Sequence, residues 1–294
     1  MKKVGFIGLG IMGRAMAINA AKAGFEVYVT NRNAEKAEAL RAYGIAPLPS
    51  PRAIADACEA VVVMVTGPEA LAAVTTGEQG LATASLEGTL VINSSTVSVD
   101  STLQTAKAVT RAGGHFLDAP VSGSRIPAET AQLVFLIGGD AEQLQVATPL
   151  LGSMGKANVV CGEIGNGTRM KLAVNLLLAN MLGALSETLV FSQKMGLDPQ
   201  HLMEAVGNSV LNAPILKMKG DAMLQRDFHP HFPLDLAFKD INLILQEAGE
   251  LGSAMPQTAA LREVFSSAMA HDYGRDDLAS ILKIIESMSG LEPQ

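Results

Sequence analysis

The sequence contains no tryptophan, and only three tyrosines and nine phenylalanines occur among its 294 residues. A mainly aliphatic core is therefore expected, with 14 methionines available to fill irregular spaces. There are only two cysteines, Cys58 and Cys161, and their spacing fits no metal site. Two free thiols in a reducing compartment, the cytoplasm, are predicted rather than a disulfide. The five histidines also lack metal-ligand spacing, so no metal is expected.

Positive charge is scarce as well. The chain has 22 Lys and Arg residues against 29 Asp and Glu residues, which gives a net charge of −7. Without a global basic field, nucleic acid and anionic membranes are unfavourable partners. An acidic protein still binds a small anionic substrate if it has a local basic pocket, so the charge limits macromolecular partners only.

No stretch of the sequence resembles a signal peptide or a simple membrane span. Glycines interrupt the apolar residues near the N-terminus from Gly5 onward, and no small-residue cleavage site follows. The most apolar run, residues 172–191, contains two asparagines, a serine and Glu187. That is too many polar groups for a span of about 20 residues. A buried helix is predicted there, without a membrane partner.

The first half of the sequence alternates between apolar strands and helices. Strands are predicted at 3–8, 25–30, 60–65, 89–93, 115–117 and 131–137, and helices at 12–23, 34–43, 50–58, 99–112 and 141–151. Strands without polar alternation that are separated by helices imply a parallel sheet covered on both faces. We therefore predict an α/β fold with a Rossmann-like, doubly wound domain over residues 1–163.

The second half, residues 164–294, is predicted to be an all-helical domain. It begins with a long apolar helix at about 168–195, which links the two domains. Further helices are expected at 199–207, 216–225, 236–251, 257–270 and 277–288, and nothing in this half indicates a strand.

The first predicted strand leads into a glycine motif. Gly8-Leu9-Gly10-Ile11-Met12-Gly13 matches G-x-G-x-x-G. The pattern alone is weak in a chain with 28 glycines, but here it closes a strand and opens a helix, as a dinucleotide site requires. In that reading Gly8 allows the tight turn, Gly10 lets the backbone approach the pyrophosphate, and Gly13 lets the helix pack on the strand. The helix N-terminus favours the phosphates.

The second strand ends in Thr30-Asn31-Arg32-Asn33. An NAD-selective fold usually has an acidic residue here for the ribose 2′-hydroxyl. This chain has Asn31 and Arg32 instead, and a guanidinium binds a 2′-phosphate that a carboxylate would repel. The sequence therefore predicts NADP(H) as the cofactor; the alternative is that Arg32 is a solvated loop residue.

Two other strands end in polar turns at what should be the same edge of the sheet. Val65 and Thr66 follow one strand, and Thr96 follows the next. Ligands bind at the carboxyl edge of open α/β sheets. The backbone of Val65 and Thr66 and the Thr96 hydroxyl are therefore candidates for binding the cofactor, although each on its own fits an ordinary turn.

Three other segments combine hydroxyl, amide and basic groups. Ser122 and Gly123 lie in Asp118–Ser124, a loop by composition, and are candidates to bind a substrate carboxylate. Lys171 and Asn175 are four residues apart and so share a face of the long helix. A buried lysine there is suited to give a proton to a carbonyl oxygen or to stabilise the alkoxide. Lys239, at an expected helix start, is a candidate for the cofactor; a surface lysine is the alternative.

These residues, in this order and spacing, resemble the β-hydroxyacid dehydrogenase family over essentially the whole chain. Four blocks carry the resemblance: the glycine motif, Asp118-Ala119-Pro120-Val121-Ser122-Gly123, Gly165-Asn166-Gly167 through Lys171 and Asn175, and Lys239-Asp240. The resemblance implies that Lys171 is the catalytic acid/base and that Ser122 and Gly123 hold the substrate carboxylate. It also implies Thr96 and Lys239 at the cofactor, and a homodimer or homotetramer assembled through the helical domain.

Within the family, Asn31-Arg32 and the stretch Ser122–Glu129 resemble the NADPH-dependent glyoxylate/succinic semialdehyde reductases. That branch often has Lys and His where this chain has Ile126 and Asp235. The resemblance implies reduction of a small aldehyde-acid. Oxidation of 3-hydroxyisobutyrate or a related β-hydroxyacid with NAD(P), tartronate semialdehyde reduction, imine reduction and a non-enzymatic NADP-binding role are the alternatives.

Overall fold

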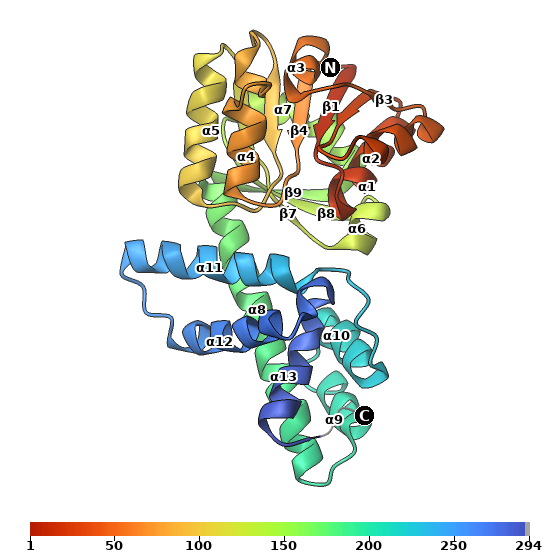
Figure 1. Ribbon diagram of the computed structural model, residues 1–294, viewed down its shortest axis with the longest axis vertical. Coiled ribbons are helices and arrows are strands. Elements are labelled where there is room, and N and C mark those ends of the chain that lie inside the picture. Colours follow the sequence, from red (N-terminus) through yellow and green to blue (C-terminus); the bar gives the residue numbers. More distant parts are fainter. Residues whose placement is uncertain (292–294) are drawn as a thin grey trace. The chain divides into compact units, whose positions relative to one another are not determined.

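The computed structural model describes residues 1–291, and the chain divides into two compact units, Met1–Leu172 and the residues from Ala173 onward. Figure 1 shows an α/β unit and a helical unit. The division falls inside one long helix, whereas the sequence suggested a boundary at residues 163/164. The α/β class with a helical second unit is confirmed.

The first unit is built on a single nine-stranded sheet with the order β3-β2-β1-β4-β5-β6-β8-β7, in which β9 also pairs with β8. The strands are β1 (Lys3–Ile7), β2 (Glu26–Thr30), β3 (Ala46–Pro47), β4 (Ala60–Val63), β5 (Leu90–Asn93), β6 (His115–Asp118), β7 (Val121–Ser122), β8 (Leu133–Gly138) and β9 (Gly155–Gly162). All pairs from β3 to β6 are parallel, as the sequence predicts.

The sheet is mixed rather than wholly parallel, which corrects the prediction. Both β6 and β7 pair with β8 in antiparallel fashion. A parallel connection needs a crossover of a dozen or more residues, usually a helix, to bring the chain back. Here Ala119 and Pro120 run straight from β6 into β7, so the chain continues along one side of β8. The segment predicted as a loop therefore contains the short strand β7.

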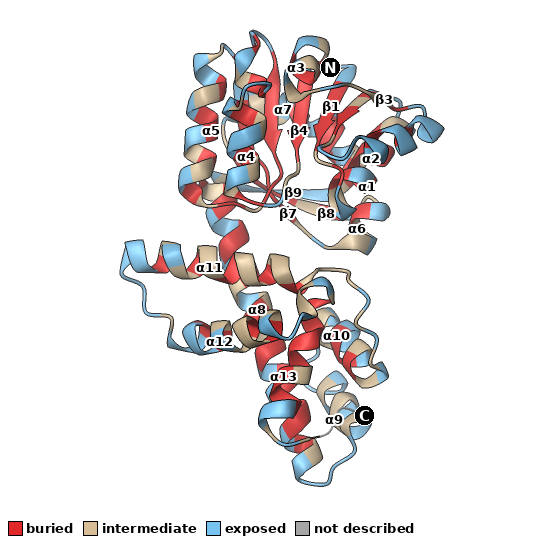
Figure 2. Cartoon of the chain, in the orientation of Figure 1, coloured by how far each residue is buried: buried red, intermediate tan, exposed pale blue. Residues whose placement is uncertain are grey.

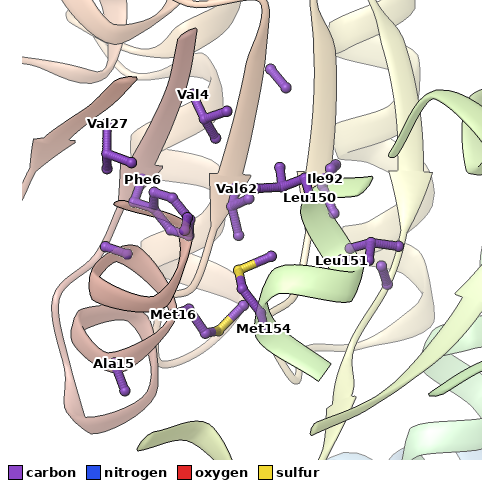
Figure 3. Packing of buried hydrophobic residues seen from close by; sticks show 14 of the residues in the cluster. Val4, Phe6, Ala15, Met16, Val27, Val62, Ile92, Leu150, Leu151 and Met154 are labelled. Carbon is purple, nitrogen blue, oxygen red and sulfur yellow. The ribbon is translucent and has the colours of Figure 1, made fainter. Parts of the chain in front are cut away.

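Helices cover both faces of the sheet. They are α1 (Ile11–Lys22), α2 (Ala34–Glu38), α3 (Pro51–Ala57), α4 (Pro68–Thr76), α5 (Val99–Arg111), α6 (Arg125–Glu129) and α7 (Ala141–Met154). On one face Phe6 and Val62 pack against Met16 and Met154 (Figure 3). Alternate residues of the same strands, such as Val63, enter a second apolar cluster on the other face. The strands are thus buried on both sides, which explains their lack of polar alternation.

The second unit is all-helical among the residues that the structure describes. Its helices are α8 (Asn166–Lys194), whose start belongs to the first unit, α9 (Pro199–Gly207), α10 (Pro214–Gln225), α11 (Leu234–Leu251), α12 (Pro256–Ala270) and α13 (Ile281–Met288). Each predicted helix is found, with ends shifted by up to four residues. The core contains Leu182, Leu189, Ile241, Phe265 and Ile281. Figure 2 colours the buried stretches of α8 and α13 red.

Within residues 1–291, α8 is the one helix long and apolar enough to cross a membrane by length and composition. Its side chains indicate a different environment. Leu182 and Leu189 pack in the apolar core of the second unit, and the polar residues Ser186 and Ser192 are buried along the same helix. Both hydroxyls donate to carbonyl groups of α8 itself, Ser186 to Leu182 and Ser192 to Leu189. These contacts are those of a core helix, as the sequence predicts.

Candidate active site

The carboxyl ends of five parallel strands lie at one edge of the sheet. Ile7 of β1 pairs in register with Thr30 of β2 and Val63 of β4. Val63 pairs with Asn93 of β5, which pairs with Asp118 of β6. The glycine motif, Asn31-Arg32, Val65-Thr66 and Thr96 each follow one of these strand ends. The structure therefore gathers these predicted site residues at the edge where open α/β sheets bind ligands.

The glycine motif is a tight turn between β1 and α1. Gly8 has a φ of +96°, and its N–H donates to the carbonyl of Thr30 at 3.1 Å. A Cβ on Gly13 would overlap the carbonyl oxygen of Gly8. Both residues must therefore be glycine for structural reasons: Gly8 because of its left-handed conformation, and Gly13 because helix and turn touch.

Gly10 is different, because a Cβ there would meet nothing within 4 Å. It precedes the first turn of α1, a 12-residue helix that has no side-chain cap hydrogen bond. The N–H groups at the start of that turn, those of Ile11 and Met12, have no partner within the helix and form the positive end of its dipole. Open space beside an uncapped helix N-terminus fits the pyrophosphate of a dinucleotide, which these N–H groups would hold.

Asn31 ties the end of β2 to the glycine motif. Its Oδ1 accepts from the N–H of Leu9 at 2.9 Å, and its Nδ2 donates to the carbonyl of Asn33 at 3.0 Å. Sequence reasoning placed Asn31 at the cofactor but did not foresee this contact between loops. Arg32, the next residue, is exposed. No acidic residue occurs from Thr30 to Asn33.

Ser95, which the sequence did not single out, holds the loop after β4. The N–H of Val65 donates to Ser95 Oγ at 3.0 Å, and that hydroxyl donates to the carbonyl of Val63 at 3.3 Å. Ser95 is fully buried, whereas Thr66 is exposed and Thr96 half-buried. Three hydroxyl residues follow one another in Ser94-Ser95-Thr96, and nothing in the sequence distinguishes the one that holds the loop after β4. The structural role of Ser95 was therefore not predicted.

Ser122 and Gly123 stand at the end of β7. Ser122 is half-buried and pairs with Val134 of β8. Gly123 has a φ of +131°, and a Cβ there would lie 2.9 Å from Leu133 Cδ2 and 3.0 Å from Pro127 Cβ. The backbone that was proposed to bind a carboxylate is therefore fixed by strand pairing on one side and by close packing on the other.

Lys171 and Asn175 are both buried, at 8% and 4% exposure, although they are polar. They lie one turn apart on α8, so they share a face of this helix. A lysine near a helix end is ordinarily solvated, but this one is withdrawn from water. Such burial is unusual for a lysine and is typical of a functional residue.

The first turn of α8 is attached to the sheet through Asp118 at the end of β6. Asp118 Oδ2 accepts from the N–H groups of Gly165 at 3.0 Å and Thr168 at 2.8 Å. Its Oδ1 accepts from the Thr168 hydroxyl at 2.8 Å. Burial raises the pKa of Asp118 to about 6, although N–H donors such as Thr168 lower it. Asp118 stood in a motif of the sequence, but its partners, 47 and 50 positions away, were not predictable.

In the second unit, Asp240 links two other predicted residues. Asn175 Nδ2 donates to Asp240 Oδ2 at 2.6 Å, and Lys239 Nζ lies 2.7 Å from Asp240 Oδ1. Lys239 lies six residues into α11 by count, because this helix begins at Leu234. The helix thus begins two residues before the predicted start at 236, and Lys239 lies in its second turn rather than at its very start. The N–H of Leu234 donates to the carbonyl of Asp276.

Comparison with known proteins agrees with this arrangement. A family model described as the NAD binding domain of 6-phosphogluconate dehydrogenase matches residues 3–165. A second, described as "NAD-binding of NADP-dependent 3-hydroxyisobutyrate dehydrogenase", matches residues 165–285. Together these two models span both units.

Individual relatives match over nearly the whole chain. A chloroplastic glyoxylate/succinic semialdehyde reductase 2 of Arabidopsis thaliana is 36% identical over 98% of this chain and 81% of its own. The 2-hydroxy-3-oxopropionate reductase of Escherichia coli is 35% identical over 98% of both chains. Among solved structures, a Mycobacterium tuberculosis 3-hydroxyisobutyrate dehydrogenase with L-serine has a TM-score of 0.87 and 28% identity, covering 96% of this chain and 98% of that one.

These matches confirm the resemblance inferred from the four sequence blocks, and the activity is that of an oxidoreductase acting on CH–OH groups with NAD(P). The chain belongs to the 3-hydroxyisobutyrate dehydrogenase-like β-hydroxyacid dehydrogenase family.

Proposed function

We propose that this protein reduces a small aldehyde-acid, such as glyoxylate or succinic semialdehyde, to the hydroxy acid with NADPH. The observation that carries the proposal is Lys171, a lysine only 8% exposed on a helix that starts at the carboxyl edge of the sheet. The relatives named as glyoxylate/succinic semialdehyde reductases, at 36% and 35% identity, support the substrate class.

The residues of the glycine motif would hold NADPH, and the chemistry it would supply is a hydride for the carbonyl carbon of the substrate. Lys171 donates a proton to the carbonyl oxygen as charge develops there, and its ammonium stabilises that charge. Ser122 and the N–H of Gly123 hold the substrate carboxylate, which orients the carbonyl. Asn175, whose amide is fixed by Asp240, orients the reacting groups from one turn further along α8.

NADP(H) is proposed over NAD(H) on the chemistry of the loop after β2. A 2′-phosphate carries two negative charges at neutral pH, and Arg32 is the exposed guanidinium at this strand end. The absence of an acidic residue from Thr30 to Asn33 removes the usual partner of a free 2′-hydroxyl. We also propose the cytoplasm as the location, from the free thiols Cys58 and Cys161.

The nearest alternatives use the same site in other ways. Reduction of tartronate semialdehyde, or oxidation of 3-hydroxyisobutyrate or a similar β-hydroxyacid with NAD(P), needs the same lysine and carboxylate clamp, and relatives of both kinds are similar to this chain. An imine reductase has to protonate nitrogen instead. A non-enzymatic NADP-binding role would leave the buried pair Lys171 and Asn175 without a use.

A steady-state screen tests the proposal. Glyoxylate, succinic semialdehyde, tartronate semialdehyde, 3-hydroxyisobutyrate and a cyclic imine are assayed with NADPH and NADH, or with the oxidised forms. Lys171→Ala should lower kcat by about 100-fold or more, the scale of a lost general acid, while NADPH binding is kept. Lys194→Ala, at the exposed far end of the same helix, is the control. Full turnover in Lys171→Ala would refute the catalytic assignment.

We further propose that the helical unit forms a homodimer or homotetramer. On α8, Leu177 and Phe191 are apolar and 63% and 64% exposed, and Met195, one residue past the end of this helix, is 53% exposed. With Met181, Ala184 and Thr188 they repeat at steps of three or four residues, a spacing typical of a helix seam. Phe191→Glu should lower the mass measured by light scattering, whereas Glu187→Gln should not. An unchanged mass for Phe191→Glu would exclude this face.

A further inference from the structure

The carboxylate of Asp118 is fully buried, and it takes no part in the reaction proposed above. Three hydrogen bonds join its side chain to the start of α8: two from the backbone N–H groups of Gly165 and Thr168, and one from the Thr168 hydroxyl. Hydrogen bonds to a charged acceptor are roughly twice as strong as neutral ones. Asp118 thus joins the end of β6 to the first turn of the helix that carries Lys171.

Close packing leaves this first turn little freedom. A Cβ on Gly167 would lie 2.8 Å from the carbonyl oxygen of Asp118 and 3.0 Å from its Oδ2. A Cβ on Gly138 of β8 would lie 2.8 Å from the nitrogen of Gly167. The backbone of α8 therefore approaches two strand ends as closely as glycine allows, and a small shift of this turn would break several contacts at once.

A third element completes the attachment. The hydroxyls of Thr168 and Thr102 lie 2.8 Å apart, and both side chains are buried. Thr102 belongs to α5, whose N-terminus is capped by Ser98 through the N–H of Ser101 at 3.1 Å. The contacts Thr102–Thr168–Asp118 therefore connect α5, α8 and β6, so the first turn of α8 is held by two separate elements of the first unit.

An ionised group at this position costs stability. Burial raises the pKa of Asp118 to about 6, so holding its charge near pH 7 is unfavourable to folding. Ser, Thr and Asn also satisfy the first N–H groups of helices, as Asp does, and they have no charge to desolvate. A buried carboxylate kept at this cost is expected where it fixes a geometry that function needs.

We propose that Asp118 is a positioning residue, which fixes the first turn of α8 and thereby sets the place of the Lys171 ammonium group. Lys171 follows Thr168 by three residues, so the two lie on the same side of the helix within one turn. A misplacement of about 1 Å at a reacting group costs about 100-fold in rate. This inference rests on the proposed role of Lys171 as proton donor.

The decisive experiment compares Asp118→Ala with Asp140→Ala. Asp140 is an exposed aspartate that precedes α7 and makes no side-chain cap hydrogen bond, so it is a matched control in the same unit. For Asp118→Ala we expect kcat to fall about tenfold or more, while the Kd of NADPH changes less than twofold. Asp118→Asn, which keeps one acceptor oxygen, should recover part of the rate.

Hydrogen exchange gives a readout that does not depend on activity. The amides of Gly165 and Thr168 should exchange at least about tenfold faster in Asp118→Ala, because each loses its acceptor. The amides of residues 182–190, in the second unit, should be unchanged. A rate loss without a change in NADPH binding separates positioning from general destabilisation, which would move both.

Two results would overturn the inference: kcat in Asp118→Ala within twofold of that in Asp140→Ala, or unchanged exchange at Gly165 and Thr168. If Asp118→Ala does not fold, Thr168→Val decides, since it removes the hydroxyl donor and leaves both N–H contacts. Its kcat should fall severalfold at constant NADPH affinity, and an unchanged kcat would count against positioning. If Lys171→Ala remains active, the proposed function fails, while the exchange experiment still tests the attachment.

Discussion

The side-chain amide of Asn175 donates to Asp240 at 2.6 Å, although the two residues are 65 positions apart. Asp240 is 4% exposed, and its other oxygen lies 2.7 Å from Lys239 Nζ. One buried carboxylate therefore orients an amide on α8 and a lysine on α11. Both were predicted as site residues on separate grounds. Asp240 stands in the block Lys239-Asp240, but its contact with Asn175 was not predicted.

Removing this carboxylate should destabilise the protein. Asp240→Ala removes the acceptor of the Asn175 amide and the carboxylate beside Lys239, and we expect the free energy of unfolding to fall by about 2–4 kcal/mol. Urea denaturation measures this. Glu250→Ala on the same helix is the control, because Glu250 accepts from Gln246 at an exposed position, and its loss should cost less than about 0.5 kcal/mol. Equal losses of unfolding free energy in the two variants would show that the buried contacts of Asp240 contribute no more than an exposed hydrogen bond.

Substitution of two glycines of the same motif should affect different properties, stability for Gly13 and cofactor binding for Gly10. Gly13→Ala forces a methyl group onto the carbonyl of Gly8, and we expect a loss of more than about 2 kcal/mol of stability. Gly10→Ala meets no protein atom, so the melting temperature should change little, while the Kd of NADPH rises about tenfold or more because the methyl takes the place of the pyrophosphate. Calorimetry and fluorescence titration check both. Normal NADPH binding in Gly10→Ala would place the pyrophosphate elsewhere.

Arg32 should decide between the two cofactors. Arg32→Ala removes a charge-assisted contact to the 2′-phosphate, so the KM for NADPH should rise about tenfold or more while that for NADH changes less than twofold. Arg41→Ala, another exposed arginine of the first unit, which pairs with Glu38, should alter neither value. If Arg32→Ala raised both KM values equally, Arg32 would not bind the 2′-phosphate.

Asp118 should also leave a signature in the pH dependence of stability. Its folded-state pKa of about 6 lies above its ordinary value of 3.8, so the folded protein holds this proton more tightly than the unfolded chain does. The contribution of Asp118 protonation to the free energy of unfolding is therefore present in full below about pH 4, and it is lost as the pH rises through 6. The gap of about two pH units corresponds to roughly 3 kcal/mol.

Asp118→Asn cannot titrate, so it provides the reference for this measurement. The free energy of unfolding of the wild type, minus that of Asp118→Asn, should decrease by up to about 3 kcal/mol between pH 4 and pH 7.5. Urea denaturation at intervals of half a pH unit gives the curve. A difference that stays level across this range would mean that Asp118 keeps an ordinary pKa in the folded protein.

Local patterns predicted most of the fold. Runs such as Ala60–Val63 are apolar throughout because helices cover both faces of the sheet. The glycine motif could be identified because the backbone itself requires glycine at Gly8 and Gly13. The antiparallel direction of β8 was not predicted. It depends on the two-residue connection between β6 and β7, and β7 is too short for the alternation of apolar and polar residues to show in the sequence.

The sequence predicted which residues belong to the site, but not the hydrogen bonds that hold them. Lys171 and Asn175 are four apart, so helix geometry alone relates them. Asp118 with Thr168, and Asn175 with Asp240, are separated by 50 and 65 positions, and only the folded chain brings them together. A single sequence does not show which residues far apart in the chain come into contact, so these two pairs could not be predicted.

The division between the two compact units falls between Leu172 and Ala173, in the middle of a helical turn rather than in a loop. For protein engineering this has a practical meaning. A chimaera that joins the first unit of this chain to the helical unit of a relative at that point would take Lys171 from one parent and Asn175 from the other. If the first unit were expressed alone, it would end at Leu172, in a frayed helical turn next to Lys171. The boundary lies within a continuous helix, so it offers no flexible linker for proteolytic cleavage. Gene fusions and truncations should therefore keep residues 165–194 as one inherited segment.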